Sequence, residues 1–111
     1  MQHKNLVAGR WGELSFAEQM GNVGSEVGRA ITRLTQGETV GKEKALERAF
    51  ELMDLTIGDG RWALRAGRLK ELARVRESLA DFFYGSNEYA TSSEDVNTYF
   101  YHFAYAARKS R

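Results

Sequence analysis

The hydrophobic pattern is strongest between Leu14 and Gln36, where apolar side chains recur at alternating steps of four and three residues. The seam consists of Phe16, Met20, Val23, Val27, Ile31 and Leu34. This spacing predicts one amphipathic helix of about 22 residues. Ser15 and Glu18 are spaced to form a reciprocal capping box at its start, and Gly37 stands where a helix commonly ends.

A stripe of small residues follows the seam one position later along the same helix. It consists of Ala17, Gly21, Gly24 and Gly28. A glycine inside a helix costs about 1 kcal/mol relative to alanine, so three of them cost about 3 kcal/mol. The stripe therefore predicts that another helix packs unusually close to this face and offsets that cost.

Three further helical segments are predicted after the first. Residues 42–57 place apolar side chains on one side, and Gly58-Asp59-Gly60 ends that helix. Residues 61–84 form the third region, which we expect to be regular only after Gly67. Ser92 or Ser93 caps the last helix. Its apolar face consists of Val96, Tyr99, Phe100, Phe103, Ala104 and Ala107.

Residues 1–13 show no sustained period and are interpreted as an N-terminal arm. The indole of Trp11 is expected to plug the end of the helical domain, with exposure for a partner as the alternative. The whole pattern predicts an all-α, antiparallel four-helix bundle that forms a single domain over residues 1–111.

Two aromatic side chains lie opposite the apolar face of the last helix. Tyr101 and Tyr105 would face water in a single four-helix domain. Aromatic residues on several sides of one helix indicate that it is buried on more than one side. We therefore expect the protein to form a homo-oligomer through Tyr101 and Tyr105, because a second copy is the simplest cover for them.

Composition narrows the class of protein without identifying it. The chain has no cysteine, which excludes disulfides, and no proline, which permits long uninterrupted helices. No apolar run approaches the ~18 residues of a membrane span, and the start of the chain lacks the apolar core of a signal peptide. We expect a soluble, cytoplasmic protein that does not associate with membranes.

Catalytic and metal-binding patterns are missing from the sequence. The two histidines, His3 and His102, are far apart and belong to no metal-ligand motif. Ser15 and Ser92 are explained as helix caps, and neither stands near a histidine in the pattern. The glycines form no phosphate-binding loop. We expect no enzymatic activity, no catalytic residue, no metal, no cofactor and no small-molecule substrate.

Clustered basic residues give the one functional signal. Between residues 61 and 76, six basic side chains accompany a single acid, Glu71. The candidate nucleic-acid-binding residues are Arg61, Arg65, Arg68, Lys70 and Arg74, with the pair Arg29 and Arg33 and the tail residues Arg108, Lys109 and Arg111. Such side chains can contact backbone phosphates.

Alternatively, the same arginines could form ion pairs within the protein. They could pair with the acid-rich second helix, whose Glu43, Glu47 and Glu51 step along one face. Arg76 lies one turn from both Leu72 and Leu79, so it is a candidate buried arginine with Asp54 as its carboxylate partner.

Three stretches of the chain carry a resemblance to known proteins. They are LSFAEQMGNVGSEVGRAI, ALERAFELMDLTI and GRLKELARVRESLADFFYG, within residues 14–85. In helix length and pattern, the chain resembles small four-helix-bundle proteins of the ribosomal intervening-sequence group, particularly the accessory variability determinants of diversity-generating retroelements. The resemblance implies a ring-shaped oligomer that holds RNA and partners a reverse transcriptase. The alternative is a protein-interaction module or accessory subunit, as in toxin–antitoxin or phage systems, with no nucleic-acid role.

Overall fold

The computed structural model describes residues 9–65, 67–88 and 90–109, and every regular element in these ranges is a helix. The elements are the 3-10 turn η1 (Trp11–Glu13), α2 (Phe16–Thr35), α3 (Thr39–Ile57), α4 (Gly60–Ala63), α5 (Arg68–Tyr84) and α6 (Ser93–Lys109). The predicted all-α class is confirmed. No helix among the described residues combines the length and the apolar character that crossing a bilayer requires.

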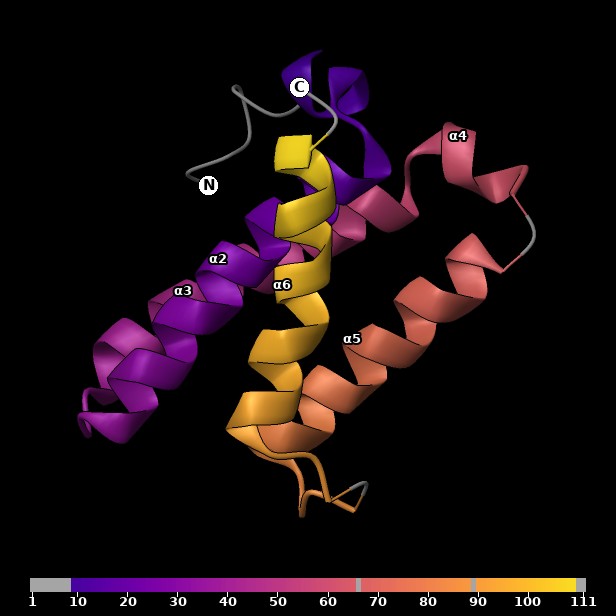
Figure 1. The fold of residues 1–111 in the computed structure, drawn as a ribbon. Helices are drawn as coiled ribbons and strands as arrows, with labels where there is room; N and C mark the ends of the chain where they lie inside the picture. The colour runs from indigo at the N-terminus through magenta and orange to yellow at the C-terminus, as the bar shows by residue number, and fades with distance from the viewer. Residues whose placement is uncertain (1–8, 66, 89, 110–111) are drawn as a thin grey trace.

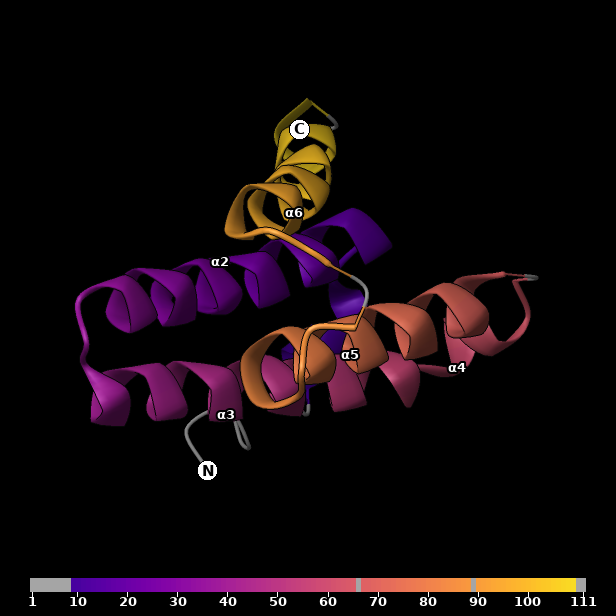
Figure 2. The ribbon, with the colours of Figure 1, turned by 90° about the horizontal axis from the view of Figure 1, so that it is seen from below.

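Helix α2 is the central element and follows its prediction closely. Ser15 Oγ accepts the Glu18 amide at 3.1 Å and Glu18 Oε1 accepts the Ser15 amide at 2.9 Å, which completes the predicted capping box. Gly37 follows the helix with φ +74°, a conformation that favours glycine. The predicted seam is buried as far as Ile31, but Leu34 is 46% exposed, because this end of the α2–α3 hairpin extends beyond α5 and α6 (Figures 1 and 2).

Helices α2 and α3 form an antiparallel hairpin, and α6 lies across the other side of α2 (Figures 1 and 2). Helix α5 runs alongside α3. The four long helices predicted from the sequence are all present. The crossing of α6 over α2 differs from a regular bundle in which all four helices run side by side.

The sequence predicted that another helix packs on the glycine stripe of α2, and in the structure this helix is α6. A Cβ atom at position 24 would lie 2.6 Å from Cβ of Phe100, closer than two carbon atoms can approach. At position 21 the nearest atom would be the Ala104 Cα at 3.6 Å, and at position 28 only an Asn97 side-chain oxygen at 4.0 Å. Gly24 is therefore the one glycine of the three that this contact requires.

A buried polar cluster closes the end of the domain near η1 and α4. Trp11 is buried, as predicted, and its Nε1–H donates to Thr56 Oγ1 at 3.2 Å. Gln19 is fully buried, and its amide nitrogen donates to the Trp11 carbonyl at 2.8 Å and to Asp59 Oδ2 at 3.0 Å. Its amide oxygen accepts the Trp62 indole N–H at 2.8 Å. Gln19 thus ties η1, α2 and the start of α4 together.

Asp59 makes the stability of this cluster depend on pH. Hydrogen bonds from Arg61 and Gln19 outweigh the effect of burial and lower the pKa of Asp59 to about 2. A carboxyl group whose pKa falls on folding stabilises the fold above its unfolded pKa of about 3.9, and this contribution is lost as pH falls through the folded value.

We expect Asp59→Asn to be less stable than the wild type at neutral pH, with the difference shrinking between about pH 4 and pH 2. Urea denaturation of both proteins across this range measures the difference. A difference in unfolding free energy that stays constant with pH would show that the Asp59 charge does not contribute to stability.

Candidate nucleic-acid interface

The basic residues predicted between positions 61 and 76 separate into two groups in the structure. The structural group consists of Arg61, Arg68 and Arg76, each of which pairs with a carboxylate of the chain. Arg61 Nη2 donates to Asp59 Oδ2 and to the Leu14 carbonyl, both at 2.7 Å, and its guanidinium lies 4.5 Å from the ring centroid of Trp62. These contacts hold the side chain against the buried polar cluster, so Arg61 is engaged in the fold itself.

Arg76 and Asp54 form the predicted ion pair, with Nε and Oδ1 2.9 Å apart. The side chains are 41% and 60% exposed, so the interpretation of Arg76 as a buried arginine was wrong. The ion pair lies at the solvent-exposed edge of the contact between α3 and α5. An exposed pair of this kind contributes roughly 0–1 kcal/mol to stability.

Arg65, Lys70 and Arg74 make up the second group. All three are exposed, and within the described part of the chain none of them forms an ion pair. Internal pairing with the acids of α3 thus accounts for Arg76 but leaves these three cations without a carboxylate in the part of the chain that the structure describes. They are the members of the predicted cluster whose charge is available to a ligand.

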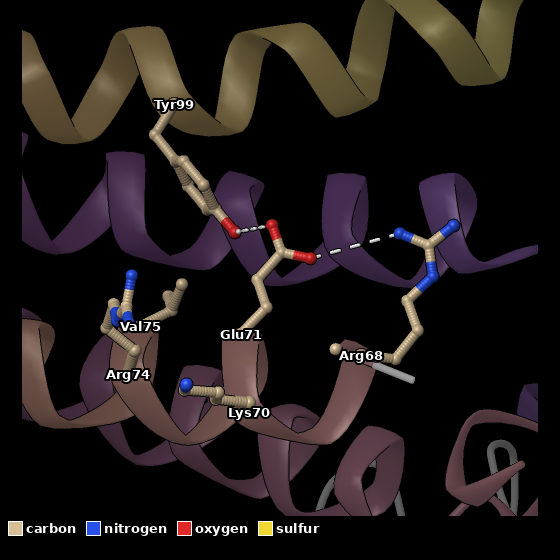
Figure 3. Close-up of a pocket in the computed structure, with 7 residues that line it drawn as sticks. Arg68, Lys70, Glu71, Arg74, Val75 and Tyr99 are labelled. Carbon is tan, nitrogen blue, oxygen red and sulfur yellow. Dashed lines mark hydrogen bonds and ion pairs between the residues drawn. The ribbon is translucent and has the colours of Figure 1, made fainter. Parts of the chain in front are cut away.

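A pocket of about 590 Å³ opens between the start of α5 and the middle of α6 (Figure 3). Its lining consists of Gly67, Arg68, Lys70, Glu71, Arg74, Val75 and Tyr99. In Figure 3, Lys70 and Arg74 lie on one side of Glu71 and Arg68 lies on the other. The pocket therefore collects three cations of the predicted interface.

A hydrogen bond between Tyr99 and Glu71 bridges the two walls of this pocket. The Tyr99 hydroxyl donates to Glu71 Oε2 at 3.0 Å, and Arg68 Nη1 lies 3.8 Å from the other carboxylate oxygen. The Arg68 guanidinium also lies 4.2 Å from the ring centroid of Phe16. Arg68 is therefore anchored on both sides, and it positions Glu71 toward α6.

The electrostatics of the pocket favour an anion. Three cations face one carboxylate, Glu71, whose charge is partly engaged by Arg68 and Tyr99. Burial and the neighbouring Glu71 raise the pKa of Tyr99, so its phenol stays neutral and remains a donor at physiological pH. The pocket also opens at the N-terminal end of α5, where free backbone N–H groups and the helix dipole attract negative charge.

An apolar pocket of about 230 Å³ continues along the same two helices. Its lining consists of Arg74, Val75, Ser78, Leu79, Thr91, Asp95, Val96, Tyr99 and Phe100. Arg74, Val75 and Tyr99 are shared with the charged pocket. The α5–α6 surface is therefore a groove that is basic at one end and apolar in the middle.

The other predicted cations lie on α2 or near the C-terminal end of α6, and none of them lines this groove. Arg29 pairs with Glu26 at 2.7 Å, and Arg33 pairs with Glu38 at 2.8 Å. Arg108 and Lys109 lie near the C-terminal end of α6, over the rings of Tyr101 and Tyr105. Arg111, which the sequence grouped with them, lies outside the described residues.

The Tyr99–Glu71 bridge was missed in the sequence. Tyr99 was placed on the apolar face of the last helix, and its ring does pack against the core. Its hydroxyl was the available signal, because a buried tyrosine hydroxyl usually needs a hydrogen-bond partner. Glu71 was visible as the one acid of the basic stretch, but the pairing depends on how α6 is placed beside α5 (Figure 1).

Among the described residues, no group of three His, Asp or Glu side chains is arranged to hold a metal ion. His102 is exposed on α6 beside Tyr101, and His3 lies outside the described ranges. Comparisons of the chain with protein-family models, with curated proteins and with solved structures gave no match.

Proposed function

We propose that this chain is a non-enzymatic accessory protein that binds RNA through the arginine-rich surface of α5. The observation that carries the proposal is a set of exposed cations, Arg65, Lys70 and Arg74, that have no carboxylate partner among the described residues. Two of them line a pocket at a helix N-terminus. Backbone phosphate is the abundant anion that such a surface fits, because it needs repeated positive charge and no catalytic group.

Self-association is the second part of the proposal. The resemblance to retroelement accessory proteins favours a cytoplasmic ring of four-helix units that presents RNA to a reverse transcriptase. Repetition of one basic surface around such a ring would strengthen binding, since linked sites act at a high effective concentration. The modest charge of a single chain, +1 overall, makes this repetition important.

A protein-interaction module is the alternative function, and the apolar part of the α5–α6 groove favours it. Val75, Leu79 and Phe100 line this part, and they fit an apolar side chain better than a phosphate. In this alternative, the neighbouring cations would orient an acidic segment of a partner protein.

The test is a titration of a labelled structured RNA at two salt concentrations, with wild type and the triple variant Arg65→Gln, Lys70→Gln, Arg74→Gln. Wild-type affinity should fall steeply with salt, because bound phosphates release counterions. Loss of three phosphate contacts should reduce the slope of log affinity against log salt by about 2 to 3. The fold should be unaffected, since these side chains form no ion pair with described residues.

Arg74→Gln and Arg76→Gln form a matched pair for this titration. Both remove one positive charge from α5, but Arg76 is already paired with Asp54. Only Arg74→Gln should weaken binding markedly. Equal affinity and equal salt slope in the wild type and the triple variant would instead assign the groove to a protein partner.

A further inference from the structure

Two tyrosine rings lie exposed on the outer face of α6. Tyr101 and Tyr105 are 56% and 51% exposed. Their ring centroids are 6.4 Å apart and their planes differ by 29°, so the rings are close to parallel. Each ring presents a flat π surface of the kind on which an unpaired base stacks.

The packing of α6 on α2 holds these rings outward. Phe100 enters the space left by the missing side chain of Gly24, which fixes the rotation of α6. Tyr99, Phe100 and Phe103 all face the core, so Tyr101 lies on the outer side of the helix. Helix α6 lies on the side of α2 opposite α3, with no described element over its outer face (Figure 2). The rings are thus held on a rigid helix.

Positive charge accompanies the two rings. The guanidinium of Arg108 lies 6.0 Å from the Tyr101 centroid, and Lys109 Nζ lies 5.9 Å from the Tyr105 centroid. Helix α6 has no carboxylate from Val96 to Lys109. Arg108 also lines a groove of about 220 Å³ with Asn22 and Ser25 of α2 and with Glu18, whose carboxylate is held in the capping box. A ligand on this face meets aromatic surface and positive charge together.

We propose that the outer face of α6 is a stacking platform for single-stranded nucleic acid. Two bases stack on Tyr101 and Tyr105, while Arg108 and Lys109 contact the flanking phosphates. This combination of aromatic rings and cations is how sequence-independent single-strand binding works, because every base has a π face. The inference rests on the proposed RNA function and adds to it that the RNA is unpaired where it contacts α6.

The rings lie in the stretch from Val96 to Lys109, which has two cations and no carboxylate, and this local charge favours a polyanion over them. A second copy of the chain is the competing occupant, because an antiparallel two-fold contact would bring Arg108 and Lys109 toward Glu94 and Asp95 at the start of the other α6. Sedimentation velocity separates the two occupants.

The test uses the full chain and three labelled probes of equal length, which are a twelve-residue oligouridine, an abasic ribose-phosphate chain and an RNA duplex. The wild type should bind oligouridine at least about tenfold more tightly than the abasic chain, since stacking adds to phosphate contact. Tyr101→Leu with Tyr105→Leu should reduce oligouridine affinity to that of the abasic chain. Tyr101→Phe with Tyr105→Phe should retain it, and duplex affinity should be the same for all variants.

Tyr84→Leu is the matched control, because Tyr84 is also 56% exposed and lies beside a cation, Lys42, at 5.9 Å. It should not change oligouridine affinity. Equal binding of oligouridine and the abasic chain by the wild type would overturn the platform. The proposed function would still stand if the triple glutamine variant flattened the salt slope. Sedimentation velocity gives an independent outcome: an oligomer that the double leucine variant converts to monomer would assign the rings to a second copy and overturn the platform.

Discussion

Gly24→Leu is expected to lower the melting temperature by roughly 10 °C or more. The Cβ atom alone would lie 2.6 Å from Cβ of Phe100 and 2.9 Å from its Cγ. Both atoms belong to a side chain that is 5% exposed and enclosed by the core, so it cannot move aside without displacing α6. Overpacking of this kind costs about 1–3 kcal/mol and sometimes more. Thermal denaturation followed by circular dichroism measures the effect.

Alanine substitutions at the three glycines of α2 provide the matched series. Gly28→Ala and Gly21→Ala add a Cβ whose nearest neighbours lie at 4.0 and 3.6 Å, which are ordinary contact distances. Both should be neutral or stabilise the protein by up to about 1 kcal/mol through helix propensity. Gly24→Ala should destabilise it. If all three alanine variants were stabilising, α6 would not pack on α2 in this register.

The helices and the close contact at the glycine stripe could be predicted from local pattern, because both depend on residues near each other in sequence. The pattern could not identify which helix fills the stripe or that only Gly24 needs the contact. Both depend on the position along α2 at which Phe100 of α6 packs. The same limit explains Leu34, which continues the apolar period to a part of α2 that α5 and α6 do not reach (Figure 2).

For the candidate site, the sequence identified the basic cluster but not which of its cations are already paired within the protein. Arg61 and Arg74 look alike in sequence, yet Arg61 is bound to Asp59 and the Leu14 carbonyl, whereas Arg74 lines a pocket without a carboxylate partner among the described residues. Pairing of this kind depends on contacts across 47 positions of the chain in the case of Leu14. The Arg76–Asp54 pair was predictable because both residues flank apolar positions, but its exposure was not.

Gln19→Leu is expected to destabilise the protein by about 3 kcal/mol, because a buried hydrogen-bonding centre would be replaced by an apolar side chain of similar size. Gln19 donates to the Trp11 carbonyl and to Asp59, and it accepts from the Trp62 indole. The substitution leaves the Trp62 N–H buried without a partner, which costs about 1–3 kcal/mol, and it removes one of the contacts that hold Asp59 in place. Urea denaturation at neutral pH measures the change in unfolding free energy.

A double-variant cycle with Trp62→Phe separates the hydrogen bond from the packing. Trp62 is 7% exposed, and its indole N–H donates to Gln19 at 2.8 Å. When both partners are removed, no N–H is left unpaired, so the double variant should be more stable than the sum of the single effects predicts, by about 1 kcal/mol or more. Asn22→Ala, which removes an exposed amide three positions along α2, should change stability by less than about 0.5 kcal/mol. Strict additivity in the cycle would mean that Gln19 acts by filling space, and the end of the domain would then be held by the two indoles alone.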